Sequence, residues 1–288
     1  MNRLSSLASS DSSPKQLPKE LHFQTAQDDS AVDRPADTTH EKNAAGLPYL
    51  LTQSAQPKMN RPRAFFLPVR YESGYRYPLV VWLHSDGYNE HQIGHVLPHI
   101  SKQNYVGVGI RGSMALDASG RRFGWSHAPA AIARCEDSIW QAVDEACERY
   151  SIHCGRVFLA GYGEGGTMAR RVALQRSSQF AGCVTLGGRL PRGGAVLSNL
   201  VAARELKNFW AVATRSSSLT QDQFDDDIRL AADARLRLDV RRYTTDDEMV
   251  TEVLGDVNAW MMRIVTGEPL PEPVSQDWAT TAVQFSSN

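Results

Sequence analysis

The sequence pattern most typical of a catalytic site lies in a glycine-rich turn. Residues 161–166 read GYGEGG, directly after the apolar run RVFLA and before the helical pattern TMARRVALQ. A strand, a sharp turn and a helix form the setting in which a G-x-S-x-G pattern holds a nucleophilic serine in a strained backbone conformation. The serine position of this pattern is Gly163, which has no side chain to react. The turn therefore predicts a nucleophile site from which the nucleophile is missing.

The same glycines also fit a phosphate-binding pattern. Gly161, Gly163 and Gly166 satisfy the G-x-G-x-x-G spacing of a dinucleotide-binding turn, which leaves a nucleotide-binding oxidoreductase as an alternative. That fingerprint usually opens the first strand–helix unit, and an acidic residue follows at the end of the next strand. Here three predicted strands precede the strand–helix unit that contains the turn, and the strand after it reads GCVTLGG. The Lys-Ser or Lys-Thr of a phosphate loop does not follow the glycines either.

Alternating apolar runs and helical patterns surround the turn and predict an α/β fold. Apolar runs predict strands at residues 63–70, 78–84, 105–110, 156–160, 182–186, 209–214 and 237–243. Helical patterns lie at residues 90–102, 130–149, 164–176, 221–234 and 247–265. This alternation is typical of a mostly parallel sheet with helices on both faces. The first two strands, joined by the polar segment YESGYR, are expected to form an antiparallel hairpin at the N-terminal edge.

The composition changes along the chain predict one folded body between two tails. Residues 1–58 are rich in Ser, Asp, Gln, Lys and Pro and carry few aromatic side chains, so we expect them to be disordered. Residues 267–288 carry three prolines and no sustained periodicity, which predicts a second, flexible tail. The α/β domain is expected over residues 59–266.

Composition also bears on partners and compartment. There are 31 basic and 32 acidic residues, a formal net charge of -1, so nothing favours nucleic acid as a partner. The sequence has no run of about 18 apolar residues, and its N-terminal residues lack a signal-peptide core, so we expect a cytoplasmic protein without a membrane span. The cysteines lack C-x-x-C spacing and are expected to be reduced and buried; they are Cys135, Cys147, Cys154 and Cys183.

Four segments of the sequence together resemble one enzyme family. They are, in chain order, YPLVVWLHSDGYNE, IRGSM with FGWSH, VFLAGYGEGG and DVNAWMM. In kind and spacing they resemble the phospholipase/carboxylesterase group of α/β-hydrolases, whose members are small serine esterases and acyl thioesterases. The first segment is similar to the strand and oxyanion loop of that family, and the third to its nucleophile elbow. The resemblance covers about residues 61–266 and implies an α/β-hydrolase fold.

The resemblance also implies where a triad of serine, acid and histidine would lie. The nucleophile position is Gly163, and the histidine position is Asp247 in the segment DDEM. The acid position aligns best with Ser218, with Asp222 as a second alignment. All eight histidines precede the turn, at positions 22, 40, 84, 91, 95, 99, 127 and 153. Because nucleophile, orienting acid and general base are all replaced, we expect a pseudo-hydrolase with a binding, scaffolding or regulatory role.

The loop that follows the second predicted strand supplies further pocket candidates. His84 matches the loop histidine of the family, which supports the shape of the loop and does not act as a base. Ser85 stands where the family usually has glycine, which restricts the backbone, and Asp86 places a negative charge near a developing oxyanion. We expect structural roles for these three residues and count Glu164, just after the turn, as a fourth pocket candidate.

An active hydrolase of ester or thioester substrates remains as an alternative. Glu164 together with Asp247 and Glu248 could share general acid and base work near the turn. Asp246 or Asp247 also suits the N-cap of the last helix, which is the more common role of such residues.

A metal is the other route to an active hydrolase. His91, His95 and His99 are spaced by four residues, so two neighbours could bind one ion from the same helix face, although Pro98 disrupts the last turn. We expect neither a metal nor a cofactor. The expected partner is a small acyl or ester ligand or another protein.

Overall fold

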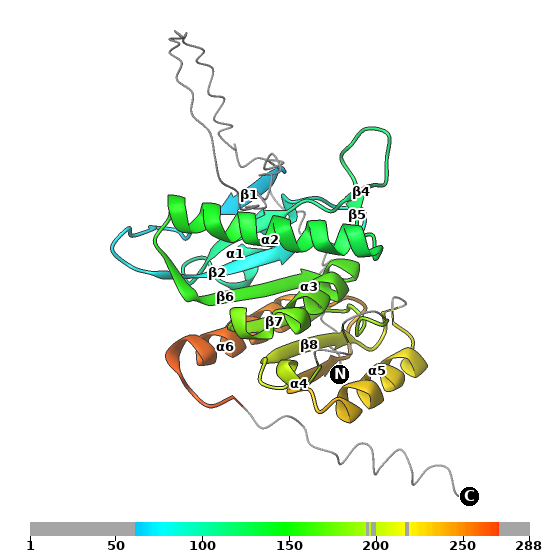
Figure 1. Cartoon of the computed structure of the whole chain (residues 1–288). Coiled ribbons are helices and arrows are strands. Elements are labelled where there is room, and N and C mark those ends of the chain that lie inside the picture. The colour runs from blue at the N-terminus through cyan, green and yellow to red at the C-terminus, as the bar shows by residue number, and fades with distance from the viewer. Residues whose placement is uncertain (1–60, 194–195, 197–199, 217–218, 271–288) are drawn as a thin grey trace, which may run out of the picture. The chain divides into compact units, whose positions relative to one another are not determined.

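The computed structural model describes residues 61–193, 196, 200–216 and 219–270 (Figure 1). The predicted N-terminal tail at residues 1–58 lies outside the described residues, as does the predicted C-terminal tail beyond residue 270. The described residues form a seven-stranded sheet with helices packed on it. No helix within these ranges is long and apolar enough to cross a membrane.

The sheet has the strand order β1-β3-β2-β6-β7-β8-β9, and all its neighbouring pairs are parallel except β1 with β3. The strands are β1 (Arg63–Phe66), β2 (Tyr77–Leu83), β3 (Val106–Ile110), β6 (Ile152–Tyr162), β7 (Gly182–Leu186), β8 (Asn208–Ala213) and β9 (Leu238–Tyr243). A separate short pair, β4 (Met114–Ala115) and β5 (Phe123–Gly124), is antiparallel. The predicted mostly parallel sheet is confirmed.

Helices cover both faces of the sheet, as predicted (Figure 1). They are α1 (Gln92–Ile100), α2 (Pro129–Arg149), α3 (Glu164–Gln175), α4 (Leu200–Ala203), α5 (Gln221–Asp233) and α6 (Thr251–Thr266), with a 3-10 turn at Ser177–Gln179. Val80 and Phe158 pack against α1 and α6, whereas Val81 and Leu159 pack against α2 and α3. Successive strand residues thus face opposite helix layers, which explains why the strands read as continuous apolar runs.

The N-terminal edge of the sheet is antiparallel, as predicted, but its hydrogen-bonded partner differs from the prediction. β1 runs beside β3, with Arg63 opposite Ile110, and has no ladder to β2. All seven residues of β2 are buried, and β2 has a neighbour on each side, β3 and β6. Because the residues of β1 are only partly buried, β1 suits the remaining edge of β3.

The last helix begins later than predicted. It starts at Thr251 with Val250 in the N-cap position, whereas the sequence pattern placed its start at residue 247. Asp247 is therefore not the N-cap. Its carboxylate accepts a hydrogen bond from the backbone N–H of Met249 and holds the turn that precedes the helix.

The four cysteines differ in how deeply they are buried. All four are free thiols, and Cys135 and Cys183 are buried as expected. Cys147 is only partly buried, and Cys154 is exposed, so the expectation of a buried thiol is wrong for Cys154. Cys154 lies in the irregular first part of β6, where the chain has not yet entered the core.

Candidate functional site

The glycine-rich turn joins β6 to α3 and holds Gly163 in an unusual backbone conformation. Gly163 has φ 56° and ψ -126°, and it is the N-cap residue of α3. Its N–H donates to the carbonyl of Leu186 at 2.8 Å, and its carbonyl accepts from the Thr167 N–H at 3.0 Å. A residue with a side chain is strained in this region, which is the geometry that the turn was predicted to have.

The surroundings of Gly163 are open, in contrast to those of the next glycines. A Cβ atom added at Gly163 would have Ser85 Cβ as its nearest neighbour, at 3.8 Å. A Cβ atom added at Gly165 would lie 2.2 Å from the carbonyl oxygen of His84. Gly165 therefore lets α3 approach the end of β2, whereas position 163 has room for a side chain that is not there.

His84 holds the loop that follows β2. It is fully buried, and its Nε2 accepts a hydrogen bond from the Gly112 N–H at 2.9 Å. Its Nδ1 therefore carries the proton and donates to the carbonyl of Ser85 at 2.8 Å. Burial lowers the pKa of His84 from its ordinary value, which favours this neutral form. Both ring nitrogens are thus used within the loop.

Ser85 is tied to the first residue of α1. Its backbone N–H donates to Gln92 Oε1 at 3.1 Å, and its hydroxyl accepts from Gln92 Nε2 at the same distance. Gln92 is buried and also accepts from Trp82 Nε1 at 3.0 Å. The hydroxyl of Ser85 thus has an amide partner and lacks the histidine that would activate it as a nucleophile.

Besides His84, the site contains a second histidine, His127, which was not among the predicted site residues. His127 Nε2 lies 3.0 Å from Glu164 Oε2, and the two side chains are 38% and 48% exposed. The hydrogen bond from His127 lowers the pKa of Glu164 below its ordinary value, and the charge of His127 adds to the effect. The sequence did indicate that these two residues could meet, because His127 precedes α2 and Glu164 is the first residue of α3. Helices that connect parallel strands begin at the carboxyl edge of the sheet, so the starts of α2 and α3 meet there.

Asp86 is the second carboxylate near Glu164. Partial burial raises the pKa of Asp86 above its ordinary value, and the negative charge of Glu164 raises it further. Each member of the predicted carboxylate pair of Glu164 and Asp247 has other partners, His127 for Glu164 and Tyr162 and the Met249 N–H for Asp247. The negative charge of Glu164 thus acts on Asp86, just as that of Asp247 acts on Glu248.

Asp247 and Glu248 are held on the β8 and β9 side of the turn. The hydroxyl of Tyr162 donates to Asp247 Oδ1 at 2.9 Å. Glu248 is buried and accepts a hydrogen bond from the Ala213 N–H at 2.8 Å. Burial raises the pKa of Glu248 above its ordinary value. Tyr162 thus links the end of β6 to the segment that precedes α6.

The other predicted positions lie away from this cluster or outside the described residues. Ser218 belongs to the latter group, and Asp222 is exposed in the first turn of α5. His95 and His99 of α1 and the N-cap residue His91 are exposed, and His91 Nε2 lies 3.6 Å from Glu90 Oε1. Across the described ranges, no three side chains of His, Cys, Asp or Glu are grouped so that they could hold a metal ion.

Comparison with known proteins shows what this architecture is similar to. The sequence matches no protein-family model and no curated protein. A carboxylesterase from Bacillus cereus matches in structure with a TM-score of 0.55 and 15% identity, over 72% of this chain and 95% of that one. The S-formylglutathione hydrolase of Staphylococcus aureus matches with a TM-score of 0.55 and 15% identity, over 72% and 92%. The chain has the α/β-hydrolase fold.

The glycine-rich turn, called the elbow region below, is the turn at which the sequence predicted a nucleophile site. β6 is the central strand of the seven in the sheet order, and Gly163 follows its last residue. A ferulic acid esterase from Anaeromyces mucronatus shares the fold with a TM-score of 0.51 and 14% identity, over 69% of this chain and 83% of that one. The fold expected from the resemblance is confirmed.

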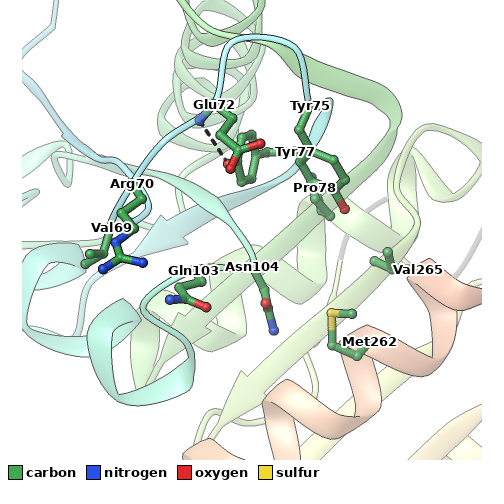
Figure 2. Close-up of a pocket in the computed structure, with 10 residues that line it drawn as sticks. All are labelled: Val69, Arg70, Glu72, Tyr75, Tyr77, Pro78, Gln103, Asn104, Met262 and Val265. Atoms are coloured by element: carbon green, nitrogen blue, oxygen red, sulfur yellow. Dashed lines mark hydrogen bonds between the residues drawn. The ribbon is translucent and has the colours of Figure 1, made fainter.

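A cavity of about 410 Å³ lies at the other end of the strands (Figure 2). Its lining includes Tyr77, the first residue of β2, and Asn104, which precedes β3. Met262 and Val265 line it from the end of α6, as Figure 2 shows. Ligands of open α/β sheets usually bind beyond the carboxyl ends of the strands, where Gly163 lies. This cavity is therefore separate from the elbow site.

Proposed function

We propose that this chain is a carboxylesterase-like α/β-hydrolase that has lost serine-esterase catalysis and keeps the elbow region for binding, scaffolding or regulation. The observation that carries the proposal is Gly163, which has the backbone geometry of an elbow nucleophile and no reactive atom. The occupant of such a region would be a small acyl or ester ligand or a protein partner. The carboxylesterase and hydrolase neighbours in structure support the first of these.

The partners of the surrounding side chains support the same proposal. Covalent acyl transfer needs a nucleophile within hydrogen-bond reach of a base. Among the hydrogen bonds that join described residues, those of histidine rings go to backbone groups or to Glu164, and none goes to a hydroxyl or thiol. Asp247, at the histidine position of the resemblance, is bound to Tyr162 and Met249.

The test is an assay of the purified full chain with short-chain p-nitrophenyl esters and with a fluorophosphonate probe. We expect turnover equal to that of a heat-denatured control and no covalent labelling. Gly163→Ser alone is expected to stay unlabelled, because it restores a hydroxyl without its base. Turnover and labelling of the unchanged chain well above the control would overturn the proposal.

One observation favours a second candidate, a hydrolase that activates water without a covalent intermediate. His127 and Glu164 form a histidine–carboxylate pair 3.0 Å apart beside the elbow, and a histidine oriented by a carboxylate can act as a general base. This candidate predicts ester hydrolysis without fluorophosphonate labelling and loss of that hydrolysis in His127→Gln. Hydrolysis that survives in His127→Gln would exclude it.

A triple variant tests the assigned triad positions directly. Gly163→Ser, Ser218→Asp and Asp247→His together place serine, acid and histidine at the positions that the resemblance gives them. We expect fluorophosphonate labelling above that of Gly163→Ser alone. Labelling in the single variant as strong as in the triple one would show that the acid and histidine positions are assigned wrongly.

A further inference from the structure

Two of the four cysteines form a close pair at the end of the sheet opposite the elbow. Cys147 lies in the last turn of α2 and Cys154 near the start of β6. Their Sγ atoms are 3.7 Å apart, and both residues are free thiols. Cys154 is exposed and Cys147 partly buried, whereas Cys135 and Cys183 are enclosed in the core. The pair therefore combines a short sulfur–sulfur distance with access from solvent.

The backbone around Cys154 is free to bring the sulfurs closer. Tyr77 pairs with Ile152, and the next pair joins Leu79 to Val157, so β6 advances from residue 152 to 157 while β2 advances from 77 to 79. The residues between, 153–156, form a bulge without partners on β2. Gly155 follows Cys154 directly and is exposed. A disulfide requires the sulfurs to approach from 3.7 Å to about 2.0 Å. The backbone of a bulge that contains a glycine can shift enough to allow this approach.

We propose that Cys147 and Cys154 are a site of reversible disulfide formation by oxidants of the peroxide class. The thiolate sulfur of Cys154 first takes one oxygen from hydrogen peroxide, whose O–O bond breaks, and becomes a sulfenic acid while hydroxide leaves. The sulfur of Cys147 then attacks the sulfur of Cys154, the S–O bond breaks, and water leaves with the proton of the Cys147 thiol. In total, two thiols are oxidised to one disulfide, and one peroxide is reduced to two waters. A dithiol reductant reverses the cross-link.

The order of the two steps follows from the surroundings of each sulfur. Cys154 is the exposed one, so peroxide reaches it first. Partial burial raises the pKa of the Cys147 thiol, and its hydrogen bond with Cys154 raises it further. Cys147 is therefore the resolving residue, which reacts once a sulfenic acid stands beside it.

The cross-link would close one end of the unit that builds the elbow site. α2 is followed directly by β6 (Figure 1). Cys147 and Cys154 flank the connection between them. The other ends of the same two elements carry His127, just before α2, and Gly163, just after β6. The inference does not rest on the function proposed for the elbow.

Differential alkylation of the full chain tests the proposal. The protein is treated with hydrogen peroxide at low concentration, and its remaining free thiols are blocked with N-ethylmaleimide. It is then digested and analysed by mass spectrometry with and without reduction. We expect a Cys147–Cys154 cross-link within one chain that disappears on reduction, while Cys135 and Cys183 stay reduced. Both sulfurs remaining free, or a cross-link found only between two chains, would overturn the proposal.

Two serine variants separate the roles of the sulfurs. Cys147→Ser is expected to form no cross-link and to accumulate a sulfenic acid on Cys154, which dimedone traps. Cys154→Ser is expected to give no dimedone adduct on Cys147. An adduct on Cys147 in Cys154→Ser as strong as that on Cys154 in Cys147→Ser would reverse the assigned order. Oxidation of Cys154 to a sulfinic acid without any cross-link in the unchanged chain would exclude the pair as a disulfide site.

Discussion

The imidazole Nε2 of His127 lies 3.0 Å from the carboxylate Oε2 of Glu164 and so joins the starts of α2 and α3 beside Gly163. The two residues are 37 positions apart in the chain. Glu164 follows the glycine directly, so the pair borders the space where a nucleophile side chain would stand. The turn at Gly163 therefore has a histidine–carboxylate pair at its border and no side chain of its own at position 163.

Replacing His127 is expected to raise the pKa of Glu164. In His127→Gln the hydrogen bond and positive charge that hold the pKa of Glu164 low are removed. Because a lowered folded-state pKa stabilises the protein above the ordinary pKa of Glu, this contribution fades as pH falls through the folded value. The measurement is a carbon NMR titration of the Glu164 carboxyl in both proteins. His95→Gln, an exposed change on α1, serves as the control. A Glu164 pKa that does not move in His127→Gln would show that the pair does not form in solution.

Replacing Glu164 is expected to lower the pKa of Asp86. Partial burial is the larger cause of the raised pKa of Asp86 and remains in Glu164→Gln, whereas the repulsion by the Glu164 charge is removed. The pKa of Asp86 should therefore fall while remaining above its ordinary value. The raised pKa of Asp86 costs stability as pH rises from the ordinary Asp range through the folded value, and this contribution of Asp86 should be smaller in Glu164→Gln. An Asp86 titration that is identical in the two proteins would contradict the coupling.

The sequence predicted the order and type of the main elements, because burial on both faces of a parallel sheet leaves continuous apolar runs. It also placed the turn at Gly163, because strand, glycine run and helix follow one another locally. The partner of β1 could not be predicted in the same way. β2 lies between β3 and β6, so the free edge to which β1 can add belongs to β3. No local sequence pattern indicates which strand is at the edge.

Side-chain partners across the site were harder to predict than the elements that carry them. Asp247 suits a helix N-cap by its position in the sequence, yet the Tyr162 hydroxyl and the Met249 N–H bind it before the helix begins. His127 lies well before the turn in the sequence, and only the meeting of two helix starts brings it to Glu164. Such contacts join segments that are distant in the chain, so local spacing does not reveal them.

Removing the charge of Asp227 is expected to destabilise the fold. Asp227 is fully buried and accepts hydrogen bonds from Arg192 at 2.6 Å, the Leu190 N–H at 2.8 Å and Arg189 at 3.0 Å. Asp227→Asn should lower the free energy of unfolding by about 1.5–3 kcal/mol, the usual value of a hydrogen bond to a charged group. Urea unfolding monitored by tryptophan fluorescence measures this difference.

The neighbouring Asp226 offers a matched control. It is exposed, and its partner Arg229 is 3.3 Å away and exposed too. Asp226→Asn should change the free energy of unfolding by less than about 1 kcal/mol, as is usual for a surface ion pair. Equal losses in the two variants would show that the buried contacts of Asp227 add nothing in solution.

Glu248 is expected to make stability depend on pH. Its buried carboxylate has a raised pKa, so the folded protein holds this proton more tightly than the unfolded chain does, and stability should fall as pH rises from the ordinary Glu range through the raised value. Glu248→Gln keeps an acceptor for the Ala213 N–H and should remove this dependence. Glu248→Ala leaves that N–H unpaired and should cost about 1–3 kcal/mol. Melting temperatures measured across pH distinguish the three proteins, and a parallel pH profile for wild type and Glu248→Gln would contradict the raised pKa.

Gly163→Ser is expected to lower the melting temperature without unfolding the protein. The new side chain has space, since its Cβ would have only Ser85 Cβ near it, at 3.8 Å, so the penalty is the backbone strain at φ 56°. Holding a residue with a side chain in such a conformation costs about 1–3 kcal/mol. Gly165→Ser is the contrasting variant, because its Cβ would meet the His84 and Leu83 carbonyl oxygens at 2.2 and 2.3 Å. Gly165→Ser should be far less stable than Gly163→Ser. Calorimetry of the two variants compares the cost of backbone strain at position 163 with that of a steric clash at position 165. A melting temperature of Gly163→Ser equal to or above that of wild type would mean that residue 163 does not hold the elbow conformation in solution.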